Sequence, residues 1–311
     1  MSLNIMSLFR AMPGSVAQGL IWGIMALGVY ITYRILDFAD LTVDGSLATG
    51  GAVCVMLIRS GVNPVVSVLI SFIVGMLCGM VTGLLHTALG IPGILASILT
   101  QISLYSINLN IMGKSNQAIN VDQYALVVSL RYITGTPLVK TLFFGGLVVF
   151  SIILICILYW YFGTEQGNAI RATGCNEQMA RAQGINTDFN KVLALMVSNG
   201  LVAMCGALYA QYQGSADVNM GRGAIVIGLA SVIIAEVIFG KFCSKRKMAF
   251  AFTLGSVIIG SIIYYLAIAI VLWLKMPSDD LKLFSAIVVA IFLAAPYLSS
   301  KFEGKKKKGA A

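Results

Sequence analysis

Acidic side chains beside apolar segments are the residues of this sequence that could bind or guide a polar solute. Asp40 and Asp44 flank the run LTV, Asp217 follows another apolar run, and Glu236 lies within GLASVIIAEVIFGK. An ionisable group inside an apolar segment is costly, so it usually faces a cavity or a partner. Two structural alternatives stay open: Glu236 could pair with the nearby Lys241, and Asp40 and Asp44 could cap the short helix that follows them.

Polar side chains also interrupt the apolar segment SLYSINLN, Ser103–Asn110. Inside a membrane such groups must find protein partners or line a wet path. Hydrogen bonding between helices explains them equally well. Our prediction for the path of a solute is Asp40, Asp44, Tyr105, Asn108, Asn110, Asp217 and Asn219.

Several kinds of site are absent from the sequence. There is no GxxxxGK[ST] loop to cradle ATP phosphates, and neither GxSxG nor HExxH occurs. The one histidine, His86, supplies neither a metal site nor a catalytic triad, and the six cysteines are scattered without a CxxC pair. We therefore expect no metal site, no catalytic residue and no cofactor in this chain.

The composition is that of a polytopic membrane protein. Hydrophobic residues make up 59% of the 311 residues and charged residues 11%, and the mean hydropathy is +0.91. A span needs about 20 apolar residues, and we expect an all-α bundle of about 8–10 membrane helices in one domain, residues 1–300, before a basic tail, residues 301–311. The apolar segments are Val16–Leu36, Gly45–Ile58, Val65–Leu89, Ile94–Met112, Thr141–Phe162, Val192–Tyr212, Gly223–Phe239, Phe250–Leu274 and Leu283–Leu298.

Two similar segments within the chain suggest an inverted repeat. FADLTVDG (Phe38–Gly45) follows a span containing GLIWGIMALGVY, and SADVNMG (Ser215–Gly221) follows a span containing GLVAMCGALYA. The two copies would point in opposite directions, which is a feature of transporters, although coincidence between apolar segments is the alternative. Gly45–Ile58 is short enough to be half of a broken helix. The glycines of GMLCGMVTGLLHTALG are spaced by four and predict close helix packing.

The polar segment Gly163–Lys191 lies between two apolar segments and predicts a docking surface. Its helix formers favour two short helices that Gly174 separates and Gly184 follows. More of the 21 Lys and Arg residues, including the basic tail, fall on its side of the membrane, which places the segment and the C-terminus in the cytoplasm. Small residues would let a partner approach closely, and Arg171 and Arg181 offer charge for its carboxylates.

Specific motifs in this segment resemble a known family. RATGCNEQMARAQGIN is similar to the RAxGxNxxxAxxxGI segment of the branched-chain amino acid and ribose permease superfamily of ATP-binding-cassette (ABC) importers. ILDFADLTVDGS, LYSINLNIMGK and GALYAQYQGSADVNMGRG are similar to the bacterial tryptophan/tyrosine-type permeases, in the same order along most of Gly19–Lys282. The resemblance assigns ATPase coupling to Gly167, Arg171, Ala172, Gly174, Asn176, Glu177, Ala180, Arg181 and Gly184.

The resemblance implies a transport subunit, not an enzyme. The chain would be the permease of an importer in the bacterial cytoplasmic membrane and would form a homodimer. A separate ATPase would hold ATP and Mg²⁺, and an extracytoplasmic binding protein would deliver the solute, which in this family is an amino acid of aromatic type. The alternative is an ion-coupled secondary transporter without an ATPase. It would need ionisable relays within its spans, and only Glu236 is well placed.

Overall fold

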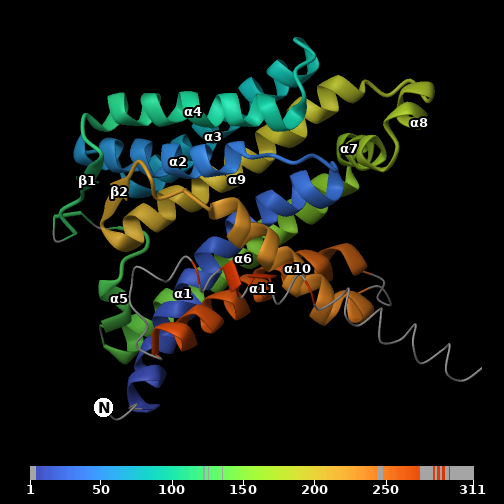
Figure 1. Ribbon diagram of the computed structural model, residues 1–311. Coiled ribbons are helices and arrows are strands. Elements are labelled where there is room, and N and C mark those ends of the chain that lie inside the picture. The colour runs from blue at the N-terminus through green and yellow to red at the C-terminus, as the bar shows by residue number, and fades with distance from the viewer. Residues whose placement is uncertain are drawn as a thin grey trace, which may run out of the picture.

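The computed structural model is a bundle of long helices (Figure 1). It describes residues 5–121, 123–124, 126–134, 136–243, 248–273, 283, 286–287, 289–290 and 294. The elements are α1 (Ile5–Tyr30), the π-helix η1 (Ile31–Ile35), α2 (Thr42–Arg59), α3 (Pro64–Thr87), α4 (Gly93–Met112), β1 (Asn116–Ala118), α5 (Arg131–Thr134), α6 (Pro137–Gly163), α7 (Glu165–Cys175), α8 (Glu177–Ala182), α9 (Thr187–Gln213), β2 (Ser215–Asp217), α10 (Ala224–Cys243) and α11 (Ala249–Trp273).

Helix length and composition confirm the helical membrane class. Among the described residues, 6 helices are long and apolar enough to cross a membrane, and α10 carries a shorter apolar stretch, Ala224–Gly240. Most of the predicted segment Leu283–Leu298 and the whole basic tail lie outside the described residues. The chain is therefore a multi-pass membrane protein.

The bundle has two distinct ends. The short helices α7 and α8 project at one end, which we call the helical end, and β1 and β2 lie at the opposite end, the strand end (Figure 1). The strands pair antiparallel, with Asn116 opposite Asp217. This small sheet was not anticipated, because three residues are too few to show an alternating pattern in the sequence.

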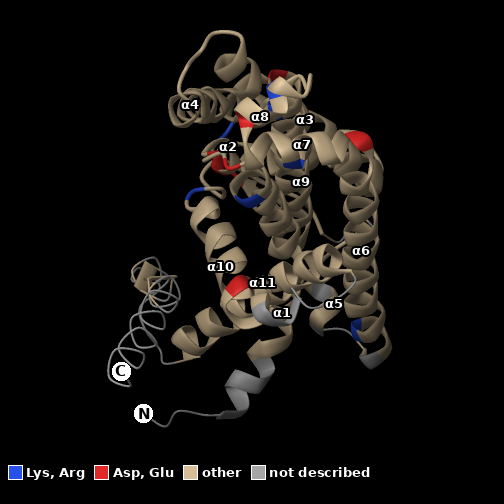
Figure 2. Ribbon diagram, turned by 90° about the vertical axis from the view of Figure 1, so that its right-hand side faces the viewer, with Lys and Arg blue, Asp and Glu red and all other residues tan. Residues whose placement is uncertain are grey.

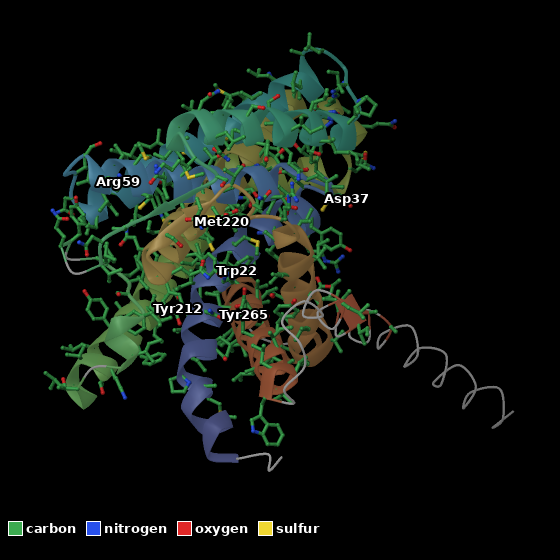
Figure 3. All side chains as sticks on the ribbon, turned by 60° about the vertical axis from the view of Figure 1, so that its left-hand side comes forward. Trp22, Asp37, Arg59, Tyr212, Met220 and Tyr265 are labelled. Atoms are coloured by element: carbon green, nitrogen blue, oxygen red, sulfur yellow. The ribbon has the colours of Figure 1, made fainter. Side chains whose placement is uncertain are left out.

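Two helices begin inside the bundle. After η1 reaches the helical end, residues 36–41 lead back without helical structure, and α2 then runs to the strand end (Figure 1). After α9 and β2, residues 218–223 lead back from the strand end, and α10 runs toward the helical end (Figure 1). Figure 3 places Met220, in the second returning segment, between Asp37 and Arg59. These opposite paths support the inverted repeat and the broken helix.

Small residues hold the two copies of the repeat together. A Cβ on Gly79 of α3 would lie 2.2 Å from the carbonyl oxygen of Leu195 in α9, and one on Gly19 of α1 would lie 2.7 Å from the Cα of Ile262 in α11. Gly75 and Gly83 meet α9 in the same way, which confirms the predicted packing stripe. If α1–α3 is taken as one copy and α9–α11 as the other, the first helix of each copy packs on the last helix of the other, so the copies interlock.

Candidate functional site

The predicted site residues fall into two groups in the structure. One group forms the α7–α8 segment, residues 163–191, at the helical end. The other lies where α2, α4 and residues 217–222 approach one another, which we call the junction. Figure 2 shows charged residues of both signs around α7 and α8 and where α2 approaches α10.

Two short helices form in the α7–α8 segment, as predicted, but Gly174 does not separate them. Gly174 lies within α7, and Asn176 makes the break because its backbone is extended, with φ −160° and ψ 102°. Its side-chain Oδ1 accepts a hydrogen bond from the Met179 N–H at 3.0 Å and so caps α8. The prediction was wrong because asparagine caps are as effective as glycine at starting a new helix.

Gly174 instead allows α7 to touch η1. A Cβ at this position would lie 1.9 Å from the carbonyl oxygen of Ile35, the last residue of η1. Gly167 makes a similar approach, 2.3 Å from the carbonyl oxygen of Tyr161. Ala172 is half-buried and Ala180 is buried. Most of the small residues expected to face a partner therefore pack within the chain.

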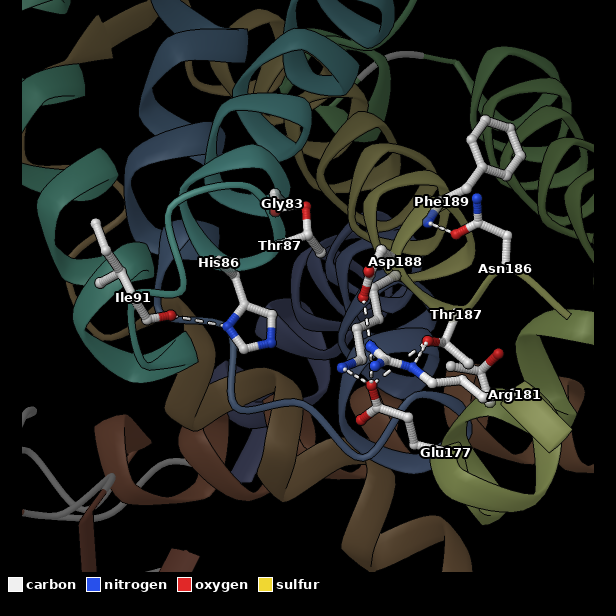
Figure 4. Close-up of polar contacts among 12 residues, drawn as sticks. Gly83, His86, Thr87, Ile91, Glu177, Arg181, Asn186, Thr187, Asp188 and Phe189 are labelled. Carbon is white, nitrogen blue, oxygen red and sulfur yellow. Dashed lines mark hydrogen bonds and ion pairs between the residues drawn. The ribbon is translucent and has the colours of Figure 1, made fainter.

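Ion pairs fasten α8 to the start of α9 (Figure 4). The Glu177 carboxylate accepts from Arg181 at 2.9 Å and from Lys191 at 2.7 Å. Arg181 also bonds Asp188 at 2.8 Å and the Thr187 hydroxyl at 2.7 Å. The hydrogen bond from Lys191 holds the pKa of Glu177 below its usual value.

The two predicted arginines both contact their own chain. Arg181 belongs to the ion pairs above, and the Arg171 guanidinium lies over the Phe250 ring, 5.0 Å from its centroid. Both remain exposed, so each still presents part of its charge outward.

Gly184 ends α8 in the left-handed conformation. Its φ is +81°, and the Ile185 N–H donates to the Ala180 carbonyl at 3.1 Å. Glycine is favoured here because other residues rarely adopt a positive φ. Lack of space is not the reason, since a Cβ would meet nothing within 4 Å.

Two exposed apolar residues of the α7–α8 segment were missed. Met179 on α8 is 63% exposed and Phe189 at the start of α9 is 54% exposed. Methionine and aromatic side chains are enriched in protein interfaces. Their apolar character within an otherwise polar segment was the signal that could have identified them.

Asp40, just before α2, is buried and bonded to protein on both oxygens. Oδ1 accepts from the Thr42 N–H at 2.9 Å, and Oδ2 accepts from Asn199 Nδ2 at 2.7 Å. The Asn199 Oδ1 in turn accepts from the Ser46 hydroxyl at 2.6 Å. Asn199, which the sequence analysis did not name, thereby ties the start of α2 to the middle of α9.

Asp44 caps a helix, but not the one predicted. It lies in the first turn of α2, and its carboxylate accepts from the backbone N–H groups of Gly223 and Ile225, both at 3.0 Å, at the start of α10. A carboxylate is favoured there because a helix N-terminus is electropositive. The partner lies far along the chain, which local sequence patterns cannot show.

Asp217 repeats the local turn of Asp40. Its Oδ1 accepts from the Asn219 N–H at 2.7 Å, two residues on, as Asp40 accepts from Thr42. Asp217 is half-buried and Asn219 is exposed at the strand end. The two similar segments in the sequence therefore correspond to a repeated turn in the structure.

A polar cavity of about 330 Å³ opens at the junction. Three of the predicted path residues, Asp44, Tyr105 and Asn108, line it. Asp40, Asn110, Asp217 and Asn219 are not among its lining residues. Arg222 and Gln101 do line it and were missed. That a solute follows these residues stays a prediction.

Glu236 forms an ion pair with Arg34, a partner that the sequence did not suggest. The Arg34 Nε lies 2.8 Å from the Glu236 Oε1, which joins η1 to α10. The expected partner, Lys241, has a side chain outside those the structure describes. Within the described residues no group of three His, Cys, Asp or Glu side chains could hold a metal ion.

Comparisons with known proteins agree with this arrangement. The family described as "Branched-chain amino acid transport system / permease component" matches residues 12–296. A tyrosine transport system permease protein of Clostridioides difficile (strain R20291) is 41% identical over 284 residues, 91% of this chain and 90% of that protein. An uncharacterised protein of Rickettsia prowazekii (strain Madrid E) is 31% identical over 284 residues, 89% of this chain and 95% of that protein.

A more distantly similar protein is a permease for another class of solute. A nucleoside ABC transporter permease of Lactococcus lactis is 29% identical over 141 residues, 40% of this chain and 44% of that protein. No solved structure matches the chain. The matches over nearly the whole length confirm the resemblance drawn from the motifs: the chain belongs to the branched-chain amino acid permease family and is a non-catalytic membrane subunit of ABC type.

Proposed function

We propose that this permease carries an aromatic amino acid, L-tyrosine in the first instance, into a bacterial cell. A separate ATPase with ATP and Mg²⁺ drives it from the cytoplasmic side, where the α7–α8 segment and the C-terminus lie. An extracytoplasmic binding protein delivers the solute at the strand end, and two identical chains form the channel. The substrate rests on the tyrosine transport permease that is similar over 91% of this chain.

One observation carries the coupling role: α7 touches the broken helices through a contact that leaves no room for a side chain. Gly174 of α7 lies against Ile35 of η1, and Arg34 of η1 bonds Glu236 of α10. From η1 the chain continues through residues 36–41 to Asp40 and α2. A movement of α7 would therefore displace both α2 and α10, the two helices that meet at the junction.

The exposed residues of the segment support docking of a protein there. Met179 and Phe189 present apolar surface beside the ion pairs of Glu177 and Arg181. Because those ion pairs are internal, they hold α8 rigid against α9, and a rigid surface transmits force better than a loose loop. The docking surface we propose is thus apolar at its centre, with charge around it.

The ion-coupled alternative has less support. A secondary transporter needs an ionisable group that is free to bind its ion within the spans. Glu236, the best candidate from the sequence, is already paired with Arg34 at 2.8 Å. That pairing favours a structural role for the carboxylate.

The test is a matched pair of surface substitutions. Met179→Glu places a charge on the proposed docking surface, and Leu130→Glu does the same at the strand end, where Leu130 is 52% exposed. Purified from native membranes, the Met179→Glu chain should lose at least about tenfold of its co-purifying ATPase, because burying an unpaired charge costs several kcal/mol. The Leu130→Glu chain should retain it.

Uptake in proteoliposomes decides between the two functions. Radiolabelled L-tyrosine should enter vesicles that hold the complex only when ATP reaches the α7–α8 side. If the chain alone moved tyrosine down a proton or sodium gradient, the ABC assignment would be lost and the secondary transporter would replace it.

A further inference from the structure

The cavity at the junction has the features of a built binding site. Its volume is about 330 Å³, near the lower limit of small-molecule pockets, and suits one small solute better than a peptide. It lies where the half-helix α2 meets the segment that leads into the half-helix α10. Its polar lining residues are Asp44, Gln101, Tyr105, Ser106, Asn108 and Arg222.

Asn108 is the strongest sign that a ligand belongs there. Its side chain is only 1% exposed, and neither Oδ1 nor Nδ2 has a hydrogen-bond partner within the described part of the chain. An unsatisfied buried amide group costs about 1–3 kcal/mol, so it is rarely kept without a role. One such side chain can both donate to and accept from a bound molecule.

The helix α4 aims its polar side chains at the cavity. Gln101, Tyr105 and Asn108 follow the helical spacing that places residues on one face. A Cβ on Gly45 would lie 3.0 Å from the Leu104 side chain, so α4 packs directly on the first turn of α2. Asn108 and Asp44 therefore line the same cavity from two helices that pack directly on each other.

Opposite charges line the same cavity. The Asp44 carboxylate uses hydrogen bonds from Gly223 and Ile225 but has about four lone-pair sites, so it can accept more. Arg222 is exposed, and the described residues provide its guanidinium with no ion pair. A guanidinium binds carboxylates with two parallel hydrogen bonds, and a carboxylate binds ammonium groups.

We propose that this cavity binds a free α-amino acid as a zwitterion during its passage. Arg222 binds the carboxylate, Asp44 binds the ammonium group, and the Asn108 amide bonds the polar groups that remain. Tyr105 provides an aromatic face for the side chain. The permease thereby selects its solute itself, beyond what a binding protein selects. This inference rests on the proposed function, because it places the site on the path of the transported amino acid.

The test measures binding without ATP or partners. The full chain in lipid nanodiscs is titrated with radiolabelled L-tyrosine, and with tyramine and 3-(4-hydroxyphenyl)propionate as competitors that lack one charge each. We expect L-tyrosine to compete at least about tenfold better than either, since each missing charged contact is worth about 1.5–3 kcal/mol. Arg222→Gln should abolish the preference over tyramine, and Arg222→Lys should restore part of it.

Asn108→Ala separates a binding role from a structural one. It should weaken tyrosine binding about tenfold without lowering the melting temperature of the unliganded chain, because it removes an unpaired amide. Ser103→Ala is the control, since Ser103 is exposed on the same helix and is not among the residues that line the cavity. It should change neither quantity.

Two results would overturn the inference and leave the proposed function standing. One is ATP-driven uptake of tyrosine with no binding to the isolated wild-type chain at millimolar concentration. The other is binding that Asn108→Ala and Arg222→Gln leave unchanged. A chain that binds tyrosine through these residues but never moves it with an ATPase would support the site and contradict the proposed function.

Discussion

The Asp40 turn and the Asp217 turn are one local structure placed in two different surroundings. In both, a carboxylate accepts from the N–H two residues on, at 2.9 Å and 2.7 Å. Asp40 is buried and also bonded to Asn199, whereas Asp217 is half-buried at the strand end. The turn is therefore present in both halves of the repeat, and we expect burial to set how much each turn contributes to stability.

The copies differ most where they meet. Four residues after Asp40 stands Asp44, whose carboxylate caps α10, and four residues after Asp217 stands Gly221. A Cβ on Gly221 would lie 1.9 Å from the Asp44 carbonyl oxygen. An acid in one copy and a glycine in the other fit together, while two identical residues would clash or leave the helix uncapped. Symmetry is broken at the junction because the two copies have to touch there.

The largest expected loss of stability comes from adding a side chain at Gly221, where the two copies touch. Gly221→Val should destabilise the chain by about 3 kcal/mol or more, because the side chain meets backbone that cannot move aside. Thermal unfolding of the purified protein measures the change. Gly255→Val is the control, because a Cβ on Gly255 in α11 meets nothing within 4 Å. Equal melting temperatures for the two variants would show that the copies do not touch as described.

The next largest effect is the difference in stability between alanine variants of the two aspartate turns. Asp40→Ala leaves the Thr42 N–H and one Asn199 hydrogen bond without a partner in a buried place, at a cost of about 2–3 kcal/mol. Asp217→Ala should cost about 1 kcal/mol or less, because water can replace the lost bond at a half-buried turn. Denaturation of the two variants side by side compares them. If Asp217→Ala were the more harmful, burial would not be what distinguishes the copies.

The smallest expected difference in stability is between alanine variants of Gly19 and Gly200. These two glycines begin the similar runs that precede the two turns. Gly19→Ala meets the backbone of Ile262 at 2.7 Å and should cost about 1–3 kcal/mol. Gly200→Ala meets side-chain atoms of Met76 and Phe72 at 2.9 Å, which can shift, so it should cost less than about 1.5 kcal/mol. Melting temperatures of the two alanine variants test this ranking. A larger loss for Gly200→Ala would mean that α9 is the more tightly packed first helix.

Much of the fold was readable from the sequence because the membrane imposes simple rules. Apolar length predicts spans, and glycines spaced by four predicted the contact of α3 with another helix. The two short helices between α6 and α9 were visible from their composition, and the motif RATGCNEQMARAQGIN indicated the family that the comparisons confirm. These properties depend on residues close together in the chain.

The sequence by itself therefore determined the class of protein, its helical segments and the pair of similar segments that suggest an inverted repeat. Only the tertiary structure decided the partners: Arg34 for Glu236, the start of α10 for Asp44, Asn199 for Asp40, and Ile35 for Gly174. Local propensity and hydropathy act over a few residues, so they fix the helices. Which buried polar groups meet depends on how those helices interlock, because each group takes whichever partner packing brings within reach.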